Sequence, residues 1–214
     1  MDDKITRRKF VKGVAGATVC CAFFPMDSLA ASEEKENEIK EGKGKEHLVA
    51  ACGIYCGVCP SYLNKHGGDK QIIMRLQKGS SSGPMRADIK WFVNFMNNQR
   101  CDGCLSGGKL AGHCQNCDIR LCALKKQKDA RCTNCEELPC NRLTNLINQG
   151  SYPHRQEYLP NLKKIREMGV EEWVKYEEER WSCPKCGQPV SWYDTKCVEC
   201  GAPRSERLFP VPEQ

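Results

Sequence analysis

Apolar positions follow a helical period in several separate stretches of the chain, with polar residues between them. In 89–96 they stand at i, i+3, i+4 and i+7, which is the spacing of one helix face. The same periodicity recurs, closed twice by a glycine, in 69–76, 141–149, 159–168 and 170–181. The pattern therefore predicts short amphipathic helices, each of which buries one face in a shared core.

The apolar content is too low for these helices to build a large core. Aromatic residues make up 7% of the chain, charged residues 28%, and the mean hydropathy is −0.61. Such a chain needs cross-links to offset the entropy that it loses on folding. Cysteine can supply them, because 15 of the 17 cysteines follow residue 30 and stand in the predicted turns between helices. They occupy two zones, 52–140 and 183–200.

The four C-terminal cysteines form the strongest metal-binding pattern in the sequence. Cys183-x2-Cys186 is followed after ten residues by Cys197-x2-Cys200, and a glycine follows each pair. Two such knuckles resemble a zinc ribbon, in which each pair turns sharply so that both sulfurs reach one ion. We therefore predict a β-hairpin zinc ribbon and tail in 181–214. Rubredoxin-type iron and two disulfides are the alternatives for these four residues.

Eleven further cysteines lie in the larger zone and include an internal repeat, a C-x2-C-x4-C motif that occurs twice with a period of 18 residues. We predict that all eleven bind metal: Cys52, Cys56, Cys59, Cys101, Cys104, Cys114, Cys117, Cys122, Cys132, Cys135 and Cys140. Eleven is one short of three four-ligand sites, so a histidine is a candidate twelfth ligand, His113 first and His66 second. The alternative is that one cysteine stays free.

Zinc is the preferred metal, with three to four ions in the whole chain, because C-x2-C pairs dominate and suit tetrahedral coordination. An iron–sulfur cluster is the alternative, although the bacterial ferredoxin spacing is absent. The spacing Cys52-x3-Cys56-x2-Cys59 also matches the cluster motif of radical S-adenosylmethionine enzymes. The chain that follows is too short for the partial barrel of such enzymes. How the cysteines pair into sites does not follow from the sequence.

The N-terminus resembles a twin-arginine export signal. The arginine pair stands in Thr6-Arg7-Arg8-Lys9-Phe10, an apolar stretch follows in 14–24, and a small-x-small pattern predicts cleavage after Ala30. We therefore expect 1–30 to be a signal peptide and the charged stretch 31–47 to be a linker. The apolar stretch is too short to span a bilayer comfortably, although an uncleaved signal could serve as an anchor.

Export by this route suits a chain that carries many thiols. Twin-arginine substrates cross the membrane folded, whereas free thiols on an unfolded chain would meet the oxidising periplasm. We therefore expect a periplasmic or extracytoplasmic protein, with the twin-arginine translocon as its partner during export and no stable membrane span after cleavage.

Four segments of the larger zone form a specific signature: AACGIYCGVCPSY, CDGCLSG, CQNCDIRLCALKK and CTNCEELPC. Together they resemble a cysteine-rich prokaryotic family catalogued as domain of unknown function 3795. The resemblance covers about 48–145 and includes all eleven cysteines. It implies a cysteine-rich metal-binding domain and carries no established activity. A C-terminal knuckle like CPKCG is similar to a frequent companion of this family.

We therefore predict a small irregular α+β fold, in which short helices are joined by metal-stapled cysteine knuckle loops. The metal-binding domain would span 48–180, and the β-hairpin ribbon would follow it. The net charge of +6 is no evidence for nucleic-acid binding, because each four-thiolate site with a divalent ion carries about −2 and would offset it.

The predicted function is an exported metal-binding accessory or interaction protein with an unidentified protein partner. The first alternative is an iron–sulfur electron carrier of a periplasmic redox complex. The second is a thiol–disulfide or metal-transfer enzyme, with one C-x2-C pair left reactive. No set of catalytic residues is recognisable, so enzymatic activity stays open and a non-enzymatic role is favoured.

Overall fold

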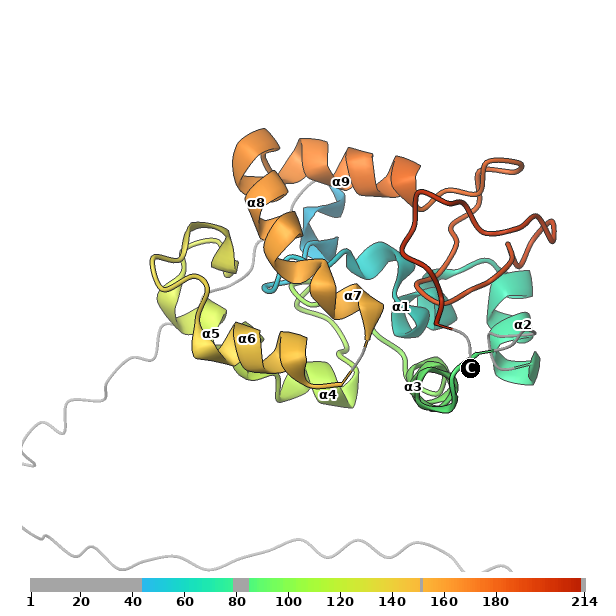
Figure 1. The fold of residues 1–214 in the computed structure, drawn as a ribbon, viewed down its shortest axis with the longest axis horizontal. Helices are drawn as coiled ribbons and strands as arrows, with labels where there is room; N and C mark the ends of the chain where they lie inside the picture. Colours follow the sequence, from blue (N-terminus) through green and yellow to red (C-terminus); the bar gives the residue numbers. More distant parts are fainter. Residues whose placement is uncertain (1–43, 79–84, 151, 213–214) are drawn as a thin grey trace, which may run out of the picture. The chain divides into compact units, whose positions relative to one another are not determined.

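The computed structural model describes residues 44–78, 85–150 and 152–212, all of which belong to one compact unit, 38–214. The predicted signal peptide and most of the predicted linker lie outside the described residues. The regular elements of the described part are helices (Figure 1). None of these helices is long and apolar enough to cross a membrane.

The described helices are short, and loops that carry cysteines join many of them. In chain order they are η1 (Lys45–Leu48), η2 (Cys56–Val58), α1 (Pro60–His66), α2 (Asp69–Lys78), α3 (Ala87–Asn97), α4 (Gly112–Gln115), α5 (Asp118–Lys126), η3 (Cys132–Asn134), α6 (Asn141–Asn148), α7 (Pro153–Gln156), α8 (Tyr158–Met168) and α9 (Val170–Arg180).

The apolar stripes of the sequence form the core, because they lie on the inward faces of α3, α6 and α8. Ile89 and Met96 of α3, Leu143 of α6, and Leu162 and Ile165 of α8 are each at most 2% exposed. The helical spacing therefore identified the buried faces of these three helices, whereas in α2 Ile73 of the predicted stripe is exposed and Gln71 is buried instead.

The C-terminal helices hold the first cysteine loop in place. Helix α8 packs on α9, which also contacts η1, while α1 packs on α2 and α3 (Figure 1). The indole of Trp173 in α9 is fully buried and meets the Tyr55 ring edge to face, with 6.1 Å between centroids. Gly53 has φ +85°, and a Cβ there would lie 2.8 Å from Cγ of Leu162. Only glycine therefore lets the loop approach α8 this closely.

The predicted α+β fold and its C-terminal β-hairpin are wrong. The described residues contain isolated β-bridges but no strand, and two of the bridges pair Ser182 with Pro189 and Lys196 with Pro203. Each of these two bridges joins the two ends of a single knuckle, as in the first, where Cys183 N–H donates to the Gln188 carbonyl and Val190 N–H to the Trp181 carbonyl. The chain turns between the two knuckles, and the buried side chain of Trp192 packs into the core. Tertiary packing therefore overrode the strand preference of the aromatic residues there.

The C-terminal segment, 181–212, packs on the helical body beside α2 (Figure 1). The hydroxyl of Ser191 donates to the carbonyl of Val58 at 2.8 Å. The buried imidazole of His154 stacks on Trp192 at 4.7 Å, and its Nδ1 lies 2.6 Å from the Tyr193 hydroxyl. Burial lowers the pKa of His154 to about 3, so this imidazole is neutral. The segment thus shares aromatic and polar contacts with the helices.

Candidate metal centre

Two loops of the same geometry carry the four C-terminal cysteines. In the first, Gly187 N–H donates to the carbonyl of Cys183 at 2.9 Å, and in the second Gly201 N–H donates to that of Cys197 at 2.9 Å. Both glycines adopt the left-handed conformation, with φ of +72° and +71°, which a side chain would strain. Each loop therefore turns back just after its second cysteine.

The four sulfurs form one compact group. The Sγ atoms of Cys183, Cys186, Cys197 and Cys200 all lie within 4.8 Å of one another. Across the two loops, Cys183 and Cys200 are 3.6 Å apart, as are Cys186 and Cys197. Thiolates at 2.3 Å from one zinc ion stand about 3.8 Å apart at the corners of a tetrahedron. The group could therefore hold one metal ion, and its sulfurs are too far apart for disulfides, whose length is about 2.05 Å.

Backbone dipoles help this site to carry negative charge. Burial opposes ionisation of Cys183, but the N–H groups of Lys185 and Cys186 and the neighbouring thiols outweigh it and lower the pKa of Cys183 to about 7. Burial raises the pKa of Cys197 to about 12, although two N–H groups of its own knuckle act against it. Four thiolates this close repel one another, so full ionisation requires a bound cation.

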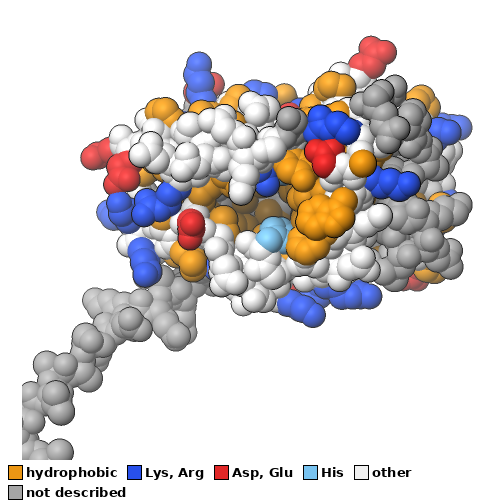
Figure 2. Space-filling view, turned by 60° about the horizontal axis from the view of Figure 1, so that its bottom comes forward, with side chains coloured by type: hydrophobic (Ala, Val, Ile, Leu, Met, Phe, Trp, Pro, Cys, Tyr) orange, Lys and Arg blue, Asp and Glu red, His pale blue; other side chains and the backbone are white. Residues whose placement is uncertain are grey.

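Most of the eleven cysteines of the larger zone lie around a cavity and not at one compact centre. Eight of them line a cavity of about 1160 Å³: Cys52, Cys56, Cys59, Cys101, Cys104, Cys114, Cys117 and Cys140. The face shown in Figure 2 is hollowed, with side chains of the hydrophobic class, which there includes cysteine, and a histidine at the hollow. Among the described residues, no ligand group as compact as the C-terminal one forms here.

Burial is the main cause that raises the pKa of the buried thiols of this zone, and neighbouring thiols add to it. Cys104 raises the pKa of both Cys56 and Cys52, and Cys117 raises that of Cys52, Cys104 and Cys132. The thiols therefore form one connected network, and these interactions assign no cysteine to a particular site.

Burial makes the thiolate form unfavourable at several cysteines of the larger zone. It raises the pKa of Cys59 to about 12 and that of Cys104 to about 11, and it raises the pKa of Cys52 well above the usual range. Ionisation of these thiols therefore needs positive charge inside the cavity. A bound metal would supply it.

The structure separates the two candidate histidines. His113 lines the cavity beside Cys114, and burial lowers its pKa. His66 faces Asp102, with 2.6 Å between its Nε2 and Oδ1, and its ring stacks on Tyr62. Neither histidine joins a compact ligand group in the described part of the chain. His154 also lines the cavity, and a single histidine outside any motif gave no sequence signal for this.

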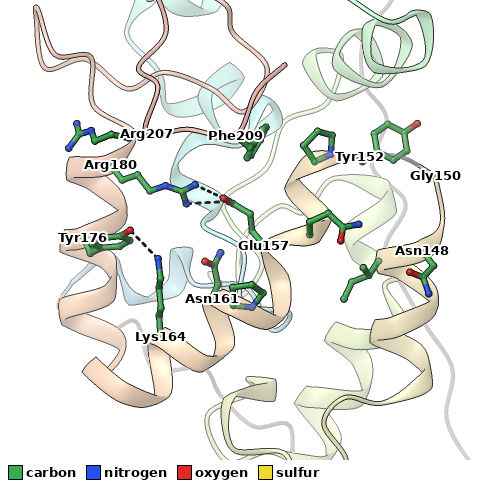
Figure 3. Close-up of a pocket in the computed structure, with 14 residues that line it drawn as sticks. Asn148, Gly150, Tyr152, Glu157, Asn161, Lys164, Tyr176, Arg180, Arg207 and Phe209 are labelled. Atoms are coloured by element: carbon green, nitrogen blue, oxygen red, sulfur yellow. Dashed lines mark hydrogen bonds and ion pairs between the residues drawn. The ribbon is translucent and has the colours of Figure 1, made fainter. Parts of the chain in front are cut away.

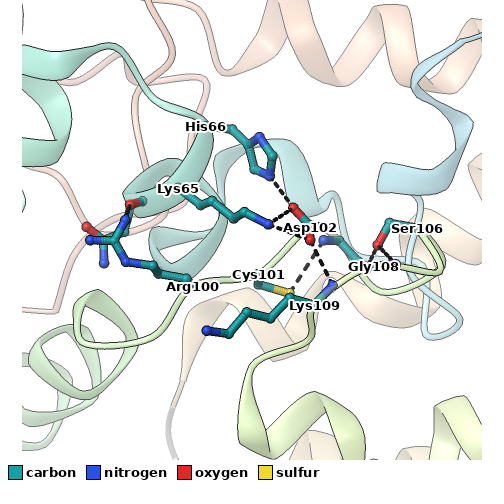
Figure 4. Close-up of polar contacts among 10 residues, drawn as sticks. Lys65, His66, Arg100, Cys101, Asp102, Ser106, Gly108 and Lys109 are labelled. Carbon is teal, nitrogen blue, oxygen red and sulfur yellow. Dashed lines mark hydrogen bonds and ion pairs between the residues drawn. The ribbon is translucent and has the colours of Figure 1, made fainter. Parts of the chain in front are cut away.

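Asp102 fixes the loop that carries Cys101 and Cys104 (Figure 4). Its carboxylate accepts from Lys65 Nζ at 2.5 and 2.6 Å, and from the backbone N–H of Lys109 at 2.8 Å. The hydrogen bond from Lys65 lowers the pKa of Asp102 most. Burial opposes this effect, but His66 and the backbone N–H of Lys109 add to it, so the pKa is lowered overall. The loop is thereby tied to α1, and sequence inspection missed this anchor because Lys65 lies far from it along the chain.

We expect Asp102→Asn to lower the free energy of unfolding by about 1–3 kcal/mol, because charge-assisted hydrogen bonds are lost from a partly buried site. The folded pKa is lowered, so the wild-type contribution is present above the unfolded value of about 3.8 and is lost as the pH falls. Urea denaturation at pH 7 measures the change. The matched control is Asp88→Asn, which removes an exposed ion pair with Arg86 and should have little effect. Equal losses in both variants would contradict the anchoring role.

A second cleft, of about 800 Å³, has no cysteine among its lining residues (Figure 3). It lies between α6, α7, α8, α9 and the C-terminal segment. Within it Arg180 contacts Glu157, and Lys164 Nζ donates to the Tyr176 hydroxyl at 3.0 Å. These contacts pair four of its polar side chains, whereas the buried Nδ2 of Asn161 has no hydrogen-bond partner among the described residues.

Comparison with known proteins supports the resemblance read from the cysteine motifs. Residues 48–145 match the model of a family described as a protein of unknown function, DUF3795. No curated protein and no solved structure matches the chain. The match therefore identifies the cysteine-rich part of the chain without assigning it an activity.

Proposed function

We propose that this protein is an exported metal-binding accessory protein, in which Cys183, Cys186, Cys197 and Cys200 hold one zinc ion as a structural element. The observation that carries the proposal is the compact group of four Sγ atoms within 4.8 Å of one another. Zinc has no geometric preference of its own and accepts four thiolates in a tetrahedron, so it suits this group.

A structural role is favoured over catalysis or metal transfer at this site. Four protein thiolates complete a tetrahedral zinc shell, whereas catalytic zinc keeps a position for water or substrate. Cys183 and Cys197 are buried, and the loop between the knuckles is tied to the helical body through Ser191 and Val58. The ion would therefore link two turns that have little regular hydrogen bonding of their own.

The metal content of the full chain tests this proposal. Protein purified without chelator should contain one zinc ion that depends on these four cysteines, and Cys200→Ser should lower zinc by one equivalent. Lys185→Ala, an exposed position between two of the ligands, should leave the zinc content unchanged. Iron in place of zinc would indicate a rubredoxin-type site. An equal zinc content in the wild type and in Cys200→Ser would contradict the assignment of these cysteines as zinc ligands.

Export by the twin-arginine pathway is the second part of the proposal, and it rests on the arginine pair in Thr6–Phe10, outside the described residues. The chain would fold and take up metal before export, which would protect its thiols from oxidation. The mature protein would then comprise the linker 31–47, the metal-binding domain 48–180 and the C-terminal segment, and its binding partner would be a periplasmic protein.

We expect replacement of Arg7 and Arg8 by Lys to leave the precursor in the cytoplasm, because the translocon recognises the arginine pair. Fractionation with an antibody against the mature domain measures the distribution. Replacing Lys4 by Arg, which leaves the arginine pair intact, is the matched control. Undiminished periplasmic delivery of the lysine variant would refute the twin-arginine route.

A further inference from the structure

The four sulfurs of the C-terminal site differ in their access to solvent. Cys183 and Cys197, the first cysteine of each knuckle, are each 2% exposed, and Cys200 is partly buried. Cys186 is exposed, as is the neighbouring Lys185. A small reagent that approaches the site from solvent therefore reaches the Cys186 sulfur first.

Each sulfur of the first knuckle has a close neighbour in the second. The Sγ atoms of Cys186 and Cys197 are 3.6 Å apart, and those of Cys183 and Cys200 are also 3.6 Å apart. A disulfide of about 2.05 Å requires an approach of only about 1.5 Å from this distance. The exposed sulfur therefore has a partner for a disulfide in the other knuckle.

Helix α2 holds the two knuckles beside one another. Nε2 of Gln71 donates to the carbonyl of Pro189 at 3.4 Å, at the end of the first knuckle. Lys70 contacts the carbonyl of Glu199 in the second knuckle, and its Nζ lies 3.6 Å from the carboxylate of the same residue. Because adjacent residues of one helix make these contacts, the two knuckles keep their relative position while one of their sulfurs reacts.

We propose that Cys186 is an oxidation site, at which a peroxide converts the zinc centre into a disulfide between Cys186 and Cys197. The inference rests on the zinc site proposed above and adds a second, oxidised state to it. A protein exported as proposed works in an oxidising compartment, so its exposed thiolates meet such reagents. The disulfide would keep the two knuckles linked after the ion has left.

The reaction takes two steps. The Cys186 thiolate attacks one oxygen of hydrogen peroxide, so that an S–O bond forms, the O–O bond breaks and hydroxide leaves. The Cys197 thiolate then attacks the sulfur of the resulting sulfenic acid, so that the S–S bond forms and a second hydroxide leaves. Two electrons thereby pass from the two sulfurs to the peroxide. Two thiolates remain for the zinc ion, which weakens its binding and releases it.

A disulfide within one knuckle is the competing product. Closing a shorter loop costs less entropy, so an unfolded chain favours the pair of Cys183 and Cys186 over that of Cys186 and Cys197. In the folded site both knuckles converge on one centre, and the distance of 3.6 Å gives Cys186 a partner across the knuckles. The pairing therefore distinguishes oxidation of the folded zinc site from oxidation of an unfolded segment.

Tryptic digestion separates the possible products. It places Cys183, Cys186 and the pair Cys197 and Cys200 in the fragments 181–185, 186–196 and 197–204, respectively. The zinc-loaded full chain is treated with increasing amounts of hydrogen peroxide, its remaining thiols are blocked with iodoacetamide, and the digest is analysed by mass spectrometry without reduction. Released zinc is measured in the same samples.

We expect the first cross-linked product of these four cysteines to join 186–196 to 197–204 through Cys197, with about one zinc ion released per cross-link. The matched control is the same chain after a chelator has removed its zinc, in which a cross-link between 181–185 and 186–196 should prevail. Any other first product from the zinc-loaded chain, or four unmodified thiols in excess peroxide, would overturn the inference. Absence of zinc before any peroxide is added would overturn the proposed function as well, so the two failures are distinguishable.

Discussion

Removing the metal from the Cys183, Cys186, Cys197 and Cys200 site is expected to unfold the C-terminal segment, 181–212. The segment contains no helix or strand, and each knuckle is closed by a few hydrogen bonds around one glycine. Structural zinc sites contribute about 10–16 kcal/mol of apparent free energy in isolated zinc fingers. This matches or exceeds the whole stability of a typical domain, about 5–15 kcal/mol. Local contacts therefore cannot replace the ion.

The aromatic side chains of the segment report on this unfolding. Trp181, Trp192 and Tyr193 are buried, so their near-ultraviolet circular dichroism should collapse when a strong chelator is added. The amide of Val190, bonded to the carbonyl of Trp181 at 2.9 Å, should lose its protection from hydrogen exchange. Cys183→Ser should behave like the chelated protein, and Lys185→Ala like the wild type. Retention of the near-ultraviolet signal after complete metal removal would contradict a structural role.

Replacing Arg180 by Met is expected to destabilise the fold by about 3–5 kcal/mol at neutral pH, because removing one partner leaves a buried charge uncompensated. Arg180 contacts Glu157 (Figure 3) and also Glu177, whose side chain is 1% exposed. The indole N–H of Trp181 also donates to Glu177 Oε2 at 2.8 Å. Without the guanidinium, one indole N–H remains to stabilise the buried Glu177 carboxylate among the contacts described here.

The pH dependence of this variant identifies the cause. Burial raises the pKa of Glu177, and the opposing effect of Arg180 is lost in Arg180→Met. A raised folded pKa makes the carboxylate destabilising above that pKa and harmless below the unfolded value of about 4.5. The deficit relative to wild type should therefore shrink as the pH falls, and Glu177→Gln in the same chain should recover part of it at pH 7.

Lys175→Met is the matched control for Arg180→Met. Lys175 lies on the same helix but is exposed, where it pairs with Glu171 and Glu172. Exposed pairs of this kind contribute little to stability, so no measurable change is expected. Guanidinium chloride denaturation of both variants measures the difference. A pH-independent loss in Arg180→Met would show that packing of its aliphatic stem, and not the charge, is what matters.

The helices of this protein follow from local sequence pattern, and the C-terminal knuckles follow from local spacing. Ile89 and Met96 stand on one face of a helix whatever surrounds them, because the helical period alone aligns them. The spacing of Cys183 and Cys186 likewise brings two sulfurs together within a single turn. The predicted β-hairpin was wrong because each bridge joins the two ends of one knuckle and no strand links the two knuckles in the described residues, while Trp192 is drawn into the core.

The grouping of the other cysteines could not be predicted. Cys56 and Cys101, for example, are brought together only because α1 packs on α3, and the contact between Lys65 and Asp102 then ties the second cysteine loop to α1. Spacing within C-x2-C motifs suggested that each pair serves one ion, which holds for the geometry of the C-terminal site. In the larger zone the described residues form no ligand group as compact as this one, although eight cysteines line one cavity.

The sequence by itself determined the positions of α2, α3, α6, α8 and α9, the buried faces of α3, α6 and α8, the compact C-terminal group of four thiols and the family to which 48–145 is matched. The helices and each knuckle depend on residues a few positions apart, whose geometry is set by the backbone, and two knuckles close to one another in the sequence make up the four-thiol group. Only the tertiary structure decided the absence of strands in the described residues, the cavity lined by eight cysteines and the buried position of Glu177. These depend on contacts between distant segments, whose geometry is set by packing of the whole chain.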